Sequence, residues 1–485
     1  MRSTAFRPPK AEPSGAWSVR GHVPLFMRML RFFLPLFICV AALAQSSPTV
    51  QVKTVANLIA LPIPLISTAF SALVTGRVTE NDGGGGVFFY QAASVTTSNL
   101  GTVFKPASTT GRWVRQYSGD LDVRWFGAVG DGSTDCSEAI QNAIATAAPG
   151  QGLKFTAAPS YYKITAPIIV SNQVSMLGDY SHVYQATAST GAFKIVTNNV
   201  SISKLRITGQ GNATFKDLER AVWIEGEVGG YLTNIVVEKC VINAWGGHGI
   251  YSRFVRNFDF RNNKISNIGY AGIIGHSVNT GSVSENSISG LTPGSAGNVY
   301  GITMTRITTG TITSDPRSSS VSIVGNVIAD APLWAGIDTH GGARITIVGN
   351  TISNVLSAIQ VVGSANSGGA IFYEPQDIAI SANTLDSGLT TGAAGFGIVF
   401  TGATGSGEKA TGSIVGNVVR GYGDVANSLS GAIRIDNTQG LVISGNTIIN
   451  PSPSGITLST TNINVAIVGN SIIDPWANSG LACAI

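Results

Sequence analysis

A short phrase of alternating hydrophobic and polar residues recurs from about residue 230 to the end of the chain. Each copy has a β-branched strand, an asparagine, any residue, an isoleucine and turn residues, and then a Gly-Ile or Ala-Ile pair that opens another strand. The shortest separations between these asparagines, 23 and 24 residues, give the bare repeat, and longer ones indicate insertions at the turns. The asparagines are Asn263, Asn286, Asn326, Asn350, Asn383, Asn417, Asn446 and Asn470.

This repeat predicts a solenoid of short parallel strands, because one repeat cannot bury its own apolar face whereas stacked repeats can. Adjacent asparagines can pass carboxamide hydrogen bonds from coil to coil, so we expect a structural ladder. In the preceding coil the ladder position is Cys240, which we expect to be an unreactive buried thiol. A leucine-rich repeat needs a leucine framework, and a β-propeller needs four antiparallel strands per blade. The pattern favours a parallel β-helix.

The composition agrees with many short strands and tight turns. The chain has 59 glycines, and only 12% of its 485 residues are charged. Valine, isoleucine, threonine, serine and asparagine suit strands and turns rather than helices, so the predicted class is all-β. The four cysteines are too few and too scattered for a disulfide framework, and stability must come from packing.

The first 44 residues resemble a processing segment. Arg28 and Arg31 precede an apolar run at residues 32–44, which ends in Ala-Leu-Ala before Gln45. This is the pattern of a signal peptide with its cleavage site. The run is shorter than the roughly 20 residues of a membrane span. We therefore expect no membrane span and a secreted or periplasmic protein.

The start of the charged region also bears on the gene start. Met27 and Met29 lie there, and if translation starts at one of them, residues 1–26 are an over-long gene start and not part of the protein. We predict a small β module at residues 45–119 and a β-helix at residues 120–485.

Removing the first 44 residues changes the charge. The whole chain has 30 basic and 26 acidic residues, and the rest of the chain has 24 and 25, a net charge of −1. Such a body lacks the basic footprint of a nucleic-acid-binding protein. We expect the partner to be a neutral or acidic polymer and not a nucleic acid.

A second signature, WFGAVGDGSTDCSEAIQNAIATA, occupies residues 125–147. After Asp135 as N-cap, apolar residues at helical spacing predict a short amphipathic helix. Such a helix would cover the exposed end of the core. We assign Asp131 and Asp135 to the turn and the cap, not to catalysis.

This motif, followed by a helix and Asn-x-Ile coils, resembles the pectate-lyase-like right-handed β-helix superfamily. Pectin-active enzymes, alginate C5-epimerases and phage tailspike depolymerases belong to it. The resemblance covers roughly residues 120 to 485 and implies a right-handed parallel β-helix, a polysaccharide partner and, from the tailspikes, a trimer. The motif specifies fold far better than substrate. Residues 83–90 and 111–126 resemble the piece before tailspike β-helices, which implies attachment, subunit contact or N-terminal packing.

The repeat also places residues in space. If the isoleucine of each Gly-Ile strand points inward, the first and third residues after it face out. In chain order the outward pairs are Trp223 and Glu225, Tyr251 and Arg253, Ile274 and His276, Thr303 and Thr305, Asp338 and His340, Gln360 and Val362, Val399 and Thr401, Arg434 and Asp436, Thr457 and Ser459.

Aromatic, basic, imidazole and carboxylate groups gather in the first five of these pairs, and the last coils are blander. Insertions at residues 291–300, 307–320 and 363–376 would wall a groove there. Tryptophan and tyrosine faces suit sugar rings, and polar groups suit their hydroxyls. The alternative is an ordinary solvated sheet face. The expected substrate-binding residues are Trp223, Glu225, Thr303, Thr305, Trp334 and Gln360.

The most informative stretch is WAGIDTHGG, residues 334–342, which puts Asp338 and His340 on one face roughly 7 Å apart. It is similar to the Asp-Pro-His motif of the mannuronan C5-epimerases, where the Asp and His are catalytic. Thr339 replaces the proline of that motif, and Ala335 stands where its catalytic tyrosine is expected. A tyrosine would then have to come from elsewhere, for example Tyr251 or Tyr270.

Uronate lyases and epimerases share one first step, the removal of the C5 proton beside the sugar carboxylate. We expect His340 to be the base and Asp338 to orient it or hold a cation. Arg253 or Arg306 would neutralise the carboxylate, and Tyr251 would supply the acid. His276 is the remaining catalytic candidate. The sequence shows no metal motif and no cofactor, although the resemblance leaves room for a loop-bound Ca²⁺.

Two other functions stay open. A glycoside hydrolase needs two carboxyl groups roughly 5 to 9.5 Å apart. At about 4.8 Å per coil, Asp338 is roughly 19 Å from Glu225 and 14 Å from Asp436, which is too far. Hydrolysis would need loop carboxylates, namely Asp315, Glu374 or Asp377. The third function is a surface adhesin that binds a glycan without cutting it.

Overall fold

The structure is a computed structural model. It describes residues 49–63, 70–292, 297–307, 311, 314–365, 372–388, 395–403, 408–423, 431–459 and 461–473. The predicted signal peptide and gene start, and parts of the three insertions, lie outside these residues.

The N-terminal part of the described chain is a five-stranded sheet of order β1-β2-β3-β5-β4. Trp113, Phe88 and Phe104 form its core with residues of a short helix, so the predicted β module is present. That helix was not predicted; Thr54 and Asn57 cap its first turn reciprocally. The elements are β1 (Thr49–Thr54), α1 (Val55–Ala60), β2 (Phe70–Gly76), β3 (Gly86–Gln91), β4 (Val103–Phe104) and β5 (Arg112–Arg115).

A capping helix precedes the solenoid, as predicted. After η1 (Val123–Phe126) comes α2 (Ser137–Thr146), whose buried residues are Ile140, Ala143 and Ile144. The N-cap is Cys136, one residue later than predicted. Asp135 still accepts the Ser137 N–H at 3.0 Å, so it serves the helix start without being its cap.

The first solenoid sheet has 13 strands, and every pairing in it is parallel. Its outward residues after β22 are small or β-branched and uncharged, such as Ser322, Thr346 and Val442. Its strands are β6 (Leu121–Asp122), β7 (Gly152–Phe155), β10 (Ser175–Gly178), β13 (Val200–Ser203), β16 (Leu232–Glu238), β19 (Val255–Arg261), β22 (Asn279–Ser284), β25 (Ser319–Val324), β27 (Thr346–Val348), β31 (Ile378–Ser381), β34 (Gly412–Val415), β37 (Val442–Ser444) and β40 (Ala466–Val468).

The second sheet has 21 strands in two rows, which bend into each other within β26 and β28. The first row is β8 (Tyr162–Ile164), β11 (His182–Gln185), β14 (Arg206–Thr208), β17 (Val241–Trp245), β20 (Lys264–Ile268), β23 (Ser287–Leu291), β26 (Val327–His340), β28 (Thr351–Val362), β32 (Thr384–Asp386), β35 (Val418–Arg420), β38 (Thr447–Ile449) and β41 (Ser471–Ile473). The second row, called the site row below, is β9 (Ile168–Val170), β12 (Phe193–Ile195), β15 (Arg220–Glu225), β18 (His248–Arg253), β21 (Ala271–His276), β24 (Tyr300–Thr305), the ends of β26 and β28, β33 (Phe396–Thr401), β36 (Gly431–Asp436) and β39 (Ser454–Leu458). A separate antiparallel pair joins β29 (Ser364–Ala365) and β30 (Phe372–Tyr373).

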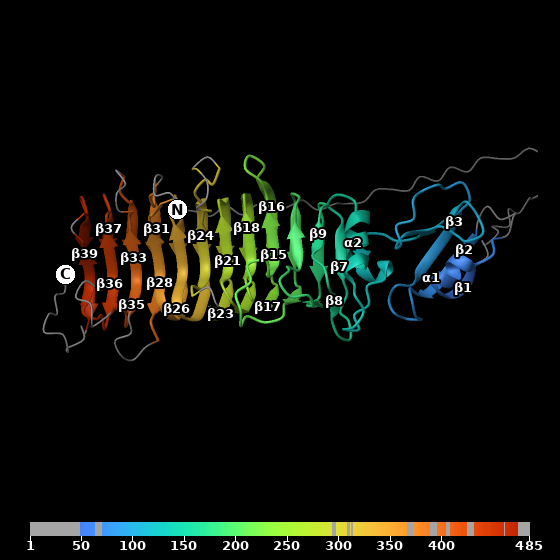
Figure 1. Cartoon of the computed structure of the whole chain (residues 1–485), viewed down its shortest axis with the longest axis horizontal. Coiled ribbons are helices and arrows are strands. Elements are labelled where there is room, and N and C mark those ends of the chain that lie inside the picture. Colours follow the sequence, from blue (N-terminus) through green and yellow to red (C-terminus); the bar gives the residue numbers. More distant parts are fainter. Residues whose placement is uncertain are drawn as a thin grey trace, which may run out of the picture. The chain divides into compact units, whose positions relative to one another are not determined.

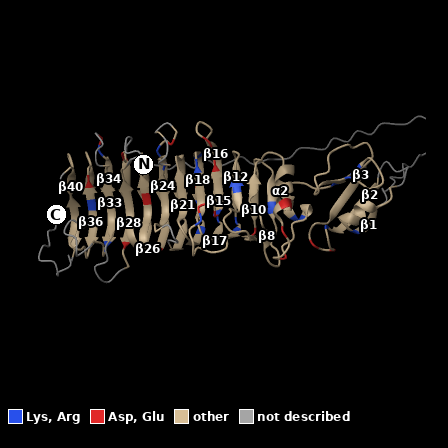
Figure 2. Ribbon diagram, viewed as in Figure 1, with Lys and Arg blue, Asp and Glu red and all other residues tan. Residues whose placement is uncertain are grey.

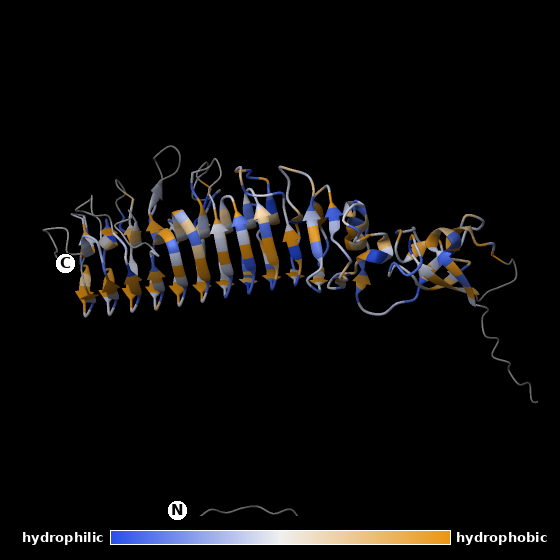
Figure 3. Cartoon of the chain, turned by 90° about the horizontal axis from the view of Figure 1, so that it is seen from below, coloured by the Kyte–Doolittle hydropathy of each residue, from blue (hydrophilic) through white to orange (hydrophobic). Residues whose placement is uncertain are grey.

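These sheets form a parallel β-helix, whose coils follow one another in chain order from α2 toward the C-terminal strands (Figure 1). Inward isoleucines, valines and phenylalanines make one continuous core along the solenoid. Hydrophobic and hydrophilic bands alternate along the strands, as the pleat requires (Figure 3). Charged residues are scattered marks on a ribbon that is otherwise uncharged (Figure 2). The predicted fold class is confirmed.

The asparagine ladder is also confirmed. In each step the backbone N–H and the side-chain amide of one asparagine donate to the Oδ1 of the next, as from Asn326 to Asn350 at 2.9 and 3.0 Å. The same amide also donates to a carbonyl of the preceding coil, here Val283. Cys240 begins the row by donating its N–H to Asn263, and burial raises the pKa of its thiol to about 12. The carboxamides inside the ladder are therefore fully hydrogen-bonded, as a buried polar row must be.

The predicted register of the site row holds from coil to coil. Trp223 pairs with Tyr251, and the same stripe continues through Ile274, Thr303 and Asp338. The strand pairings carry it on to Gln360, Val399, Arg434 and Thr457. The other outward stripe begins with Glu225, Arg253, His276 and Thr305. In the later coils it continues with His340, Val362, Thr401 and Asp436.

A third outward stripe, which strict alternation does not predict, lies just before each Gly-Ile pair. A Cβ on Gly301 would come within 2.7 Å of the core side chain Ile328, so this glycine and Ile302 both face inward. The chain bends at the glycine, and the residue before it faces out. This stripe pairs Arg220, His248, Ala271, Tyr300, Ala335, Ser357 and Phe396 in order.

Candidate active site

An aromatic layer covers the middle of the site row on its outer side. Tyr251, Ile274, Tyr300 and Ala335 form a buried cluster there, with Trp223, Tyr270 and Trp334 packed against it. Because of this layer, outward residues need not be exposed: Thr303 is 2% and Asp338 0% exposed. The middle of the site row is therefore not the ordinary solvated sheet face that was the alternative, because a second, outer core encloses its polar groups.

Asp338 and His340 form a direct pair in this layer. Asp338 Oδ2 lies 3.2 Å from His340 Nε2 and accepts the Thr303 hydroxyl at 2.9 Å. The negative charge of Asp338 raises the pKa of His340. With Nε2 bonded to the carboxylate, Nδ1 is the ring nitrogen left to take a proton, and the His340 side chain is one-third exposed. The pair therefore has the geometry of a general base held by a buried acid.

A cavity of about 310 Å³ opens beside His340. Its polar lining comes mainly from β21, β24 and β26, and Tyr270, Tyr300 and Arg306 line it together with His340. The complete lining is Tyr270, Ile274, His276, Tyr300, Thr303, Thr305, Arg306, His340 and Ser364. Five of the predicted site residues, His340, His276, Arg306, Thr303 and Thr305, thus meet at one cavity.

The two tyrosines of the cavity stay protonated. Burial raises the pKa of Tyr270 and of Tyr300, and the charge of Asp338 raises both further. Asn298 donates to the Tyr300 hydroxyl at 3.3 Å, which holds that ring in place. Each phenol can therefore act as a hydrogen-bond or proton donor near Asp338 and His340.

His276 and Arg306 also line the cavity, and they differ in charge. Burial lowers the pKa of His276 to about 3, so its imidazole is neutral. The Arg306 guanidinium lies 4.7 Å above the Tyr373 ring and donates to the Ser364 hydroxyl. Arg306 is 3% exposed, so the protein fixes its charge at the cavity wall.

Arg253 lies outside the cavity and bridges two acids. Its Nη1 is 3.5 Å from Glu225 Oε1, and its Nη2 is 3.5 Å from Asp315 Oδ1. The insertion after β24 therefore returns Asp315 to the site row, a position that the sequence did not provide. Glu225 and Asp315 flank one guanidinium, which limits the gap between their nearest oxygens to about 9 Å, inside the range for paired hydrolytic carboxyls.

A second acid–imidazole pair, missed by the sequence analysis, supports the aromatic layer. Asp217 Oδ1 is 3.1 Å from the Nε2 of the buried His248. The His248 ring makes edge contacts with Tyr251 and Tyr270, each at 5.3 Å between centroids. The hydrogen bond to His248 is the main reason that the pKa of Asp217 falls to about 2. This pair fixes two tyrosines, one of which lines the cavity.

Tyr251, the predicted acid, is part of this support. Its ring lies 3.5 Å below the Arg220 guanidinium, and burial raises its pKa to about 12. It does not line the cavity, whereas Tyr270, the alternative, does. Arg220 also stacks 4.5 Å from the Trp223 ring, whose N–H donates to Glu225. Trp223 and Glu225 are both four coils away from His340 and belong to a neighbouring surface.

Of the loop carboxylates, only Asp315 reaches the site row. Glu374 is fully buried and accepts the Ala403 N–H, so its role is structural. Asp377 is exposed in a turn with positive φ. Trp334 and Gln360 line a different, larger cavity over the later coils.

Several buried polar atoms of the site row have no hydrogen-bond partner among the described residues. They include Asp338 Oδ1, His248 Nδ1 and Arg253 Nε. Leaving a buried polar atom unpaired costs about 1–3 kcal/mol, so such a concentration needs a reason. A polar ligand that supplies the missing partners is one.

Two further observations concern metals and membranes. Within the described ranges, no three His, Cys, Asp or Glu side chains come together as a metal site would need. The same part of the chain contains no helix with the length and hydrophobicity to span a bilayer.

Comparison with known families finds two matches. Residues 196–384 match the right-handed β-helix region, and residues 51–118 match the small four-stranded β-sheet domain of phage tail proteins. The first range contains the whole cavity around His340. No curated protein matches the chain's sequence.

Solved structures share the fold at low identity. The enzymatically active domain of tailspike protein 2 from bacteriophage CBA120 superposes with a TM-score of 0.60 and 14% identity, over 86% of this chain and 61% of that one. The tailspike of the Acinetobacter baumannii bacteriophage Fri1, a capsular polysaccharide depolymerase, superposes with a TM-score of 0.59 and 14% identity, over 85% of this chain and 75% of that one. The catalytic unit of an α-1,3-glucanase from Streptomyces thermodiastaticus gives 0.54 and 18%, over 76% and 73%. These likenesses show the right-handed parallel β-helix that the sequence resemblance implied, and the chain spans about three fifths of the first of them.

Proposed function

We propose that this protein is a polysaccharide-active enzyme that removes the C5 proton of a uronate unit, as a lyase or an epimerase. The observation that carries the proposal is the Asp338–His340 pair at the wall of a cavity that also holds Arg306 and two tyrosines. This set supplies a base, a fixed cation and a proton donor within one small volume.

Each residue has a separate role in this proposal. His340 Nδ1 takes the C5 proton, and Asp338 holds Nε2–H and stabilises the imidazolium that forms. Arg306 stabilises the negative charge that develops on the sugar carboxylate. In a lyase, the electron pair then forms the C4–C5 double bond, the C4–O4 bond breaks, and Tyr270 protonates O4. In an epimerase, a tyrosine returns a proton to C5 from the opposite face.

The comparisons support the broader part of the proposal. Two of the structures with this fold are named as enzymatically active or as a capsular polysaccharide depolymerase, and a third as a glucanase. The phage-tail match of residues 51–118 supports a role for the N-terminal module in joining the β-helix to a larger assembly.

Hydrolysis is the second candidate, and one observation favours it. Glu225 and Asp315 each lie 3.5 Å from the Arg253 guanidinium, which keeps them close enough for a hydrolytic carboxyl pair, whose members are up to about 9.5 Å apart. Both, however, are tied to the same guanidinium, and Asp315 is 4% exposed. The cavity at His340 is the better-formed site.

One assay separates the candidates. The protein is incubated with alginate, polygalacturonate and capsule-type heteropolysaccharides, and products are followed by ultraviolet absorbance and by reducing ends. A lyase gives both signals, a hydrolase gives reducing ends alone, and an adhesin binds without product. Epimerisation appears only in the NMR spectrum of the polymer. Reducing ends without the absorbance of a double bond would overturn the proposal.

A further inference from the structure

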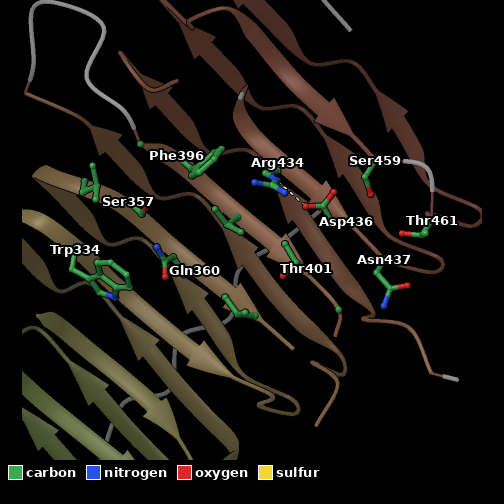
Figure 4. A pocket seen from close by; sticks show the side chains of 15 residues that line it. Trp334, Ser357, Gln360, Phe396, Thr401, Arg434, Asp436, Asn437, Ser459 and Thr461 are labelled. Carbon is green, nitrogen blue, oxygen red and sulfur yellow. Dashed lines mark hydrogen bonds and ion pairs between the residues drawn. The ribbon is translucent and has the colours of Figure 1, made fainter. Parts of the chain in front are cut away.

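A cavity of about 740 Å³ lies over the last coils of the site row, where the sequence looked bland. We call it the distal groove. Trp334 stands at one end of it, and Phe396 lies beside Arg434, whose guanidinium is 5.5 Å from the centre of the Phe396 ring (Figure 4).

The distal groove continues the same outward stripes that build the cavity at His340. Gln360 is the strand neighbour of Asp338, and Val362 is the neighbour of His340. Val399 and Arg434 follow in the next two coils. A polymer that crosses the strands would therefore pass from one site to the other, meeting a new coil about every 4.8 Å. That step is close to the length of one sugar ring along a glycan chain.

The charges of the two sites differ. Arg434 and Asp436 are the only charged residues that line the groove in the described chain, and they pair at 2.7 Å between Nε and Oδ2. Lys409 lies behind the lining, where its amine donates to the Asn437 side chain. The remaining polar groups at the groove are hydroxyls and amides. By contrast, Arg306 and His340 present fixed or protonatable positive charge at the other cavity.

We infer that the distal groove holds neutral sugar units of the same chain whose acidic unit occupies the cavity at His340, so that the substrate is a heteropolysaccharide and not a uniform polyuronate. The inference rests on the proposed function, because it places the acidic unit against Arg306. Phe396 and Trp334 offer apolar faces for sugar rings, and Gln360, Thr401 and Asn437 offer partners for hydroxyls. A polymer with a carboxylate on every unit would bring one of them close to the Asp436 carboxylate. Arg434, the cation of the groove lining, is already paired with Asp436.

Retention in affinity gels tests this, with His340→Ala as the parent chain so that polymers stay intact. The probes are gellan, in which glucuronate is separated by neutral sugars, and polygalacturonate, which has a carboxylate on every unit. Gellan should retain the parent at least tenfold more strongly. Val399→Trp fills the groove floor, so that a sugar ring can no longer enter. Gellan retention should become about tenfold weaker, as expected when one sugar ring loses its contacts. Thr346→Trp, outward on the 13-stranded sheet, is the control for a new tryptophan and should change nothing.

A second pair of variants tests the charge argument alone. Asp436→Asn frees Arg434 and should raise retention by polygalacturonate several-fold. Asp386→Asn removes the same charge from an exposed ion pair with Arg420, away from the groove, and should not. Equal retention by the two polymers, no retention by either, an unchanged Val399→Trp variant, or equal effects of the two Asp→Asn changes would overturn the inference.

Failure of the proposed chemistry would look different. It would appear as hydrolytic products from the wild-type chain, or as undiminished turnover by His340→Ala. Hydrolytic products from the wild-type chain leave the retention pattern of His340→Ala unchanged. Undiminished turnover by His340→Ala is recognised separately, because the polymer in the gel becomes shorter.

Discussion

Two rows of buried polar side chains run through the same coils, and they are built in opposite ways. In the asparagine ladder every interior carboxamide donates and accepts within the row, as at Asn350. In the site row Asp338 Oδ1 and His248 Nδ1 are buried without a partner among the described residues. The ladder is complete within the protein, as a structural element should be. The site row leaves hydrogen-bonding capacity that a ligand can satisfy.

The contrast predicts opposite effects of mutation, and the largest is on turnover. His340→Ala should lower kcat by about 10²–10⁴-fold, the usual contribution of a general base. The melting temperature should fall only modestly, because the His340 side chain is one-third exposed and Asp338 keeps the hydrogen bond from the Thr303 hydroxyl. Steady-state kinetics and thermal unfolding check this. His182→Ala, an outward histidine bonded to Thr208 in the other row, is the matched control and should keep full activity.

A ladder substitution should do the reverse. Asn350→Ala removes the acceptor of the Asn326 amides and the donor to the Ile323 carbonyl, all of them buried. At about 1–3 kcal/mol for each orphaned group, unfolding should become easier by about 3 kcal/mol or more. Denaturant titration measures this, with Ser322→Ala on the exposed sheet face as a control expected within about 0.5 kcal/mol. An Asn350→Ala chain as stable as the control would show that the ladder is dispensable.

Asp338→Asn should shift the pH dependence. Asp338 raises the pKa of His340, so the rate of a base-catalysed step rises with pH through a value above the ordinary 6.5 or so. The amide should lower that pKa and move the acidic limb of the kcat profile to lower pH. Because the pKa is raised in the folded state, the stabilisation is present below the unfolded pKa and is lost as pH rises through the folded one. The wild type should therefore lose its stability advantage over Asp338→Asn across that range, and an unshifted kcat limb would contradict the pairing.

The smallest effect is expected at the acids around Arg253. Glu225→Gln removes two partly exposed ion pairs, one with Arg253 and one with Arg220, and each is worth less than about 1 kcal/mol. Turnover should fall by less than about tenfold. A loss as large as that of His340→Ala would move the chemistry to Glu225 and Asp315 and favour hydrolysis.

The sequence was sufficient for the fold because the fold is periodic. The asparagine spacing and the alternation after each isoleucine correctly placed the ladder and two outward stripes. The stripe of Arg220, His248 and Tyr300 was missed, because the glycine after each of these positions, or the alanine after Arg220, accompanies a bend that interrupts alternation. A rule that reads the residue before the Gly-Ile pair as outward would have found it.

The non-periodic parts of the site were beyond such a rule. Asp315 comes from an insertion, whose return to Arg253 depends on contacts such as that of the Tyr373 hydroxyl with the Asp315 carbonyl. Burial was also misjudged, because an outward register suggests exposure while the aromatic layer encloses Asp338. The distal groove looked bland since its polar residues are neutral or paired.

The most direct test of the central claim is a kinetic isotope effect at C5. The wild-type chain is given the same uronate-containing polysaccharide with hydrogen or deuterium at that carbon, and formation of the unsaturated product is timed. Proton removal by His340 predicts slower turnover of the deuterated polymer, and no such product from His340→Ala. Equal rates for the two polymers, together with reducing ends that lack the double bond, would contradict the account.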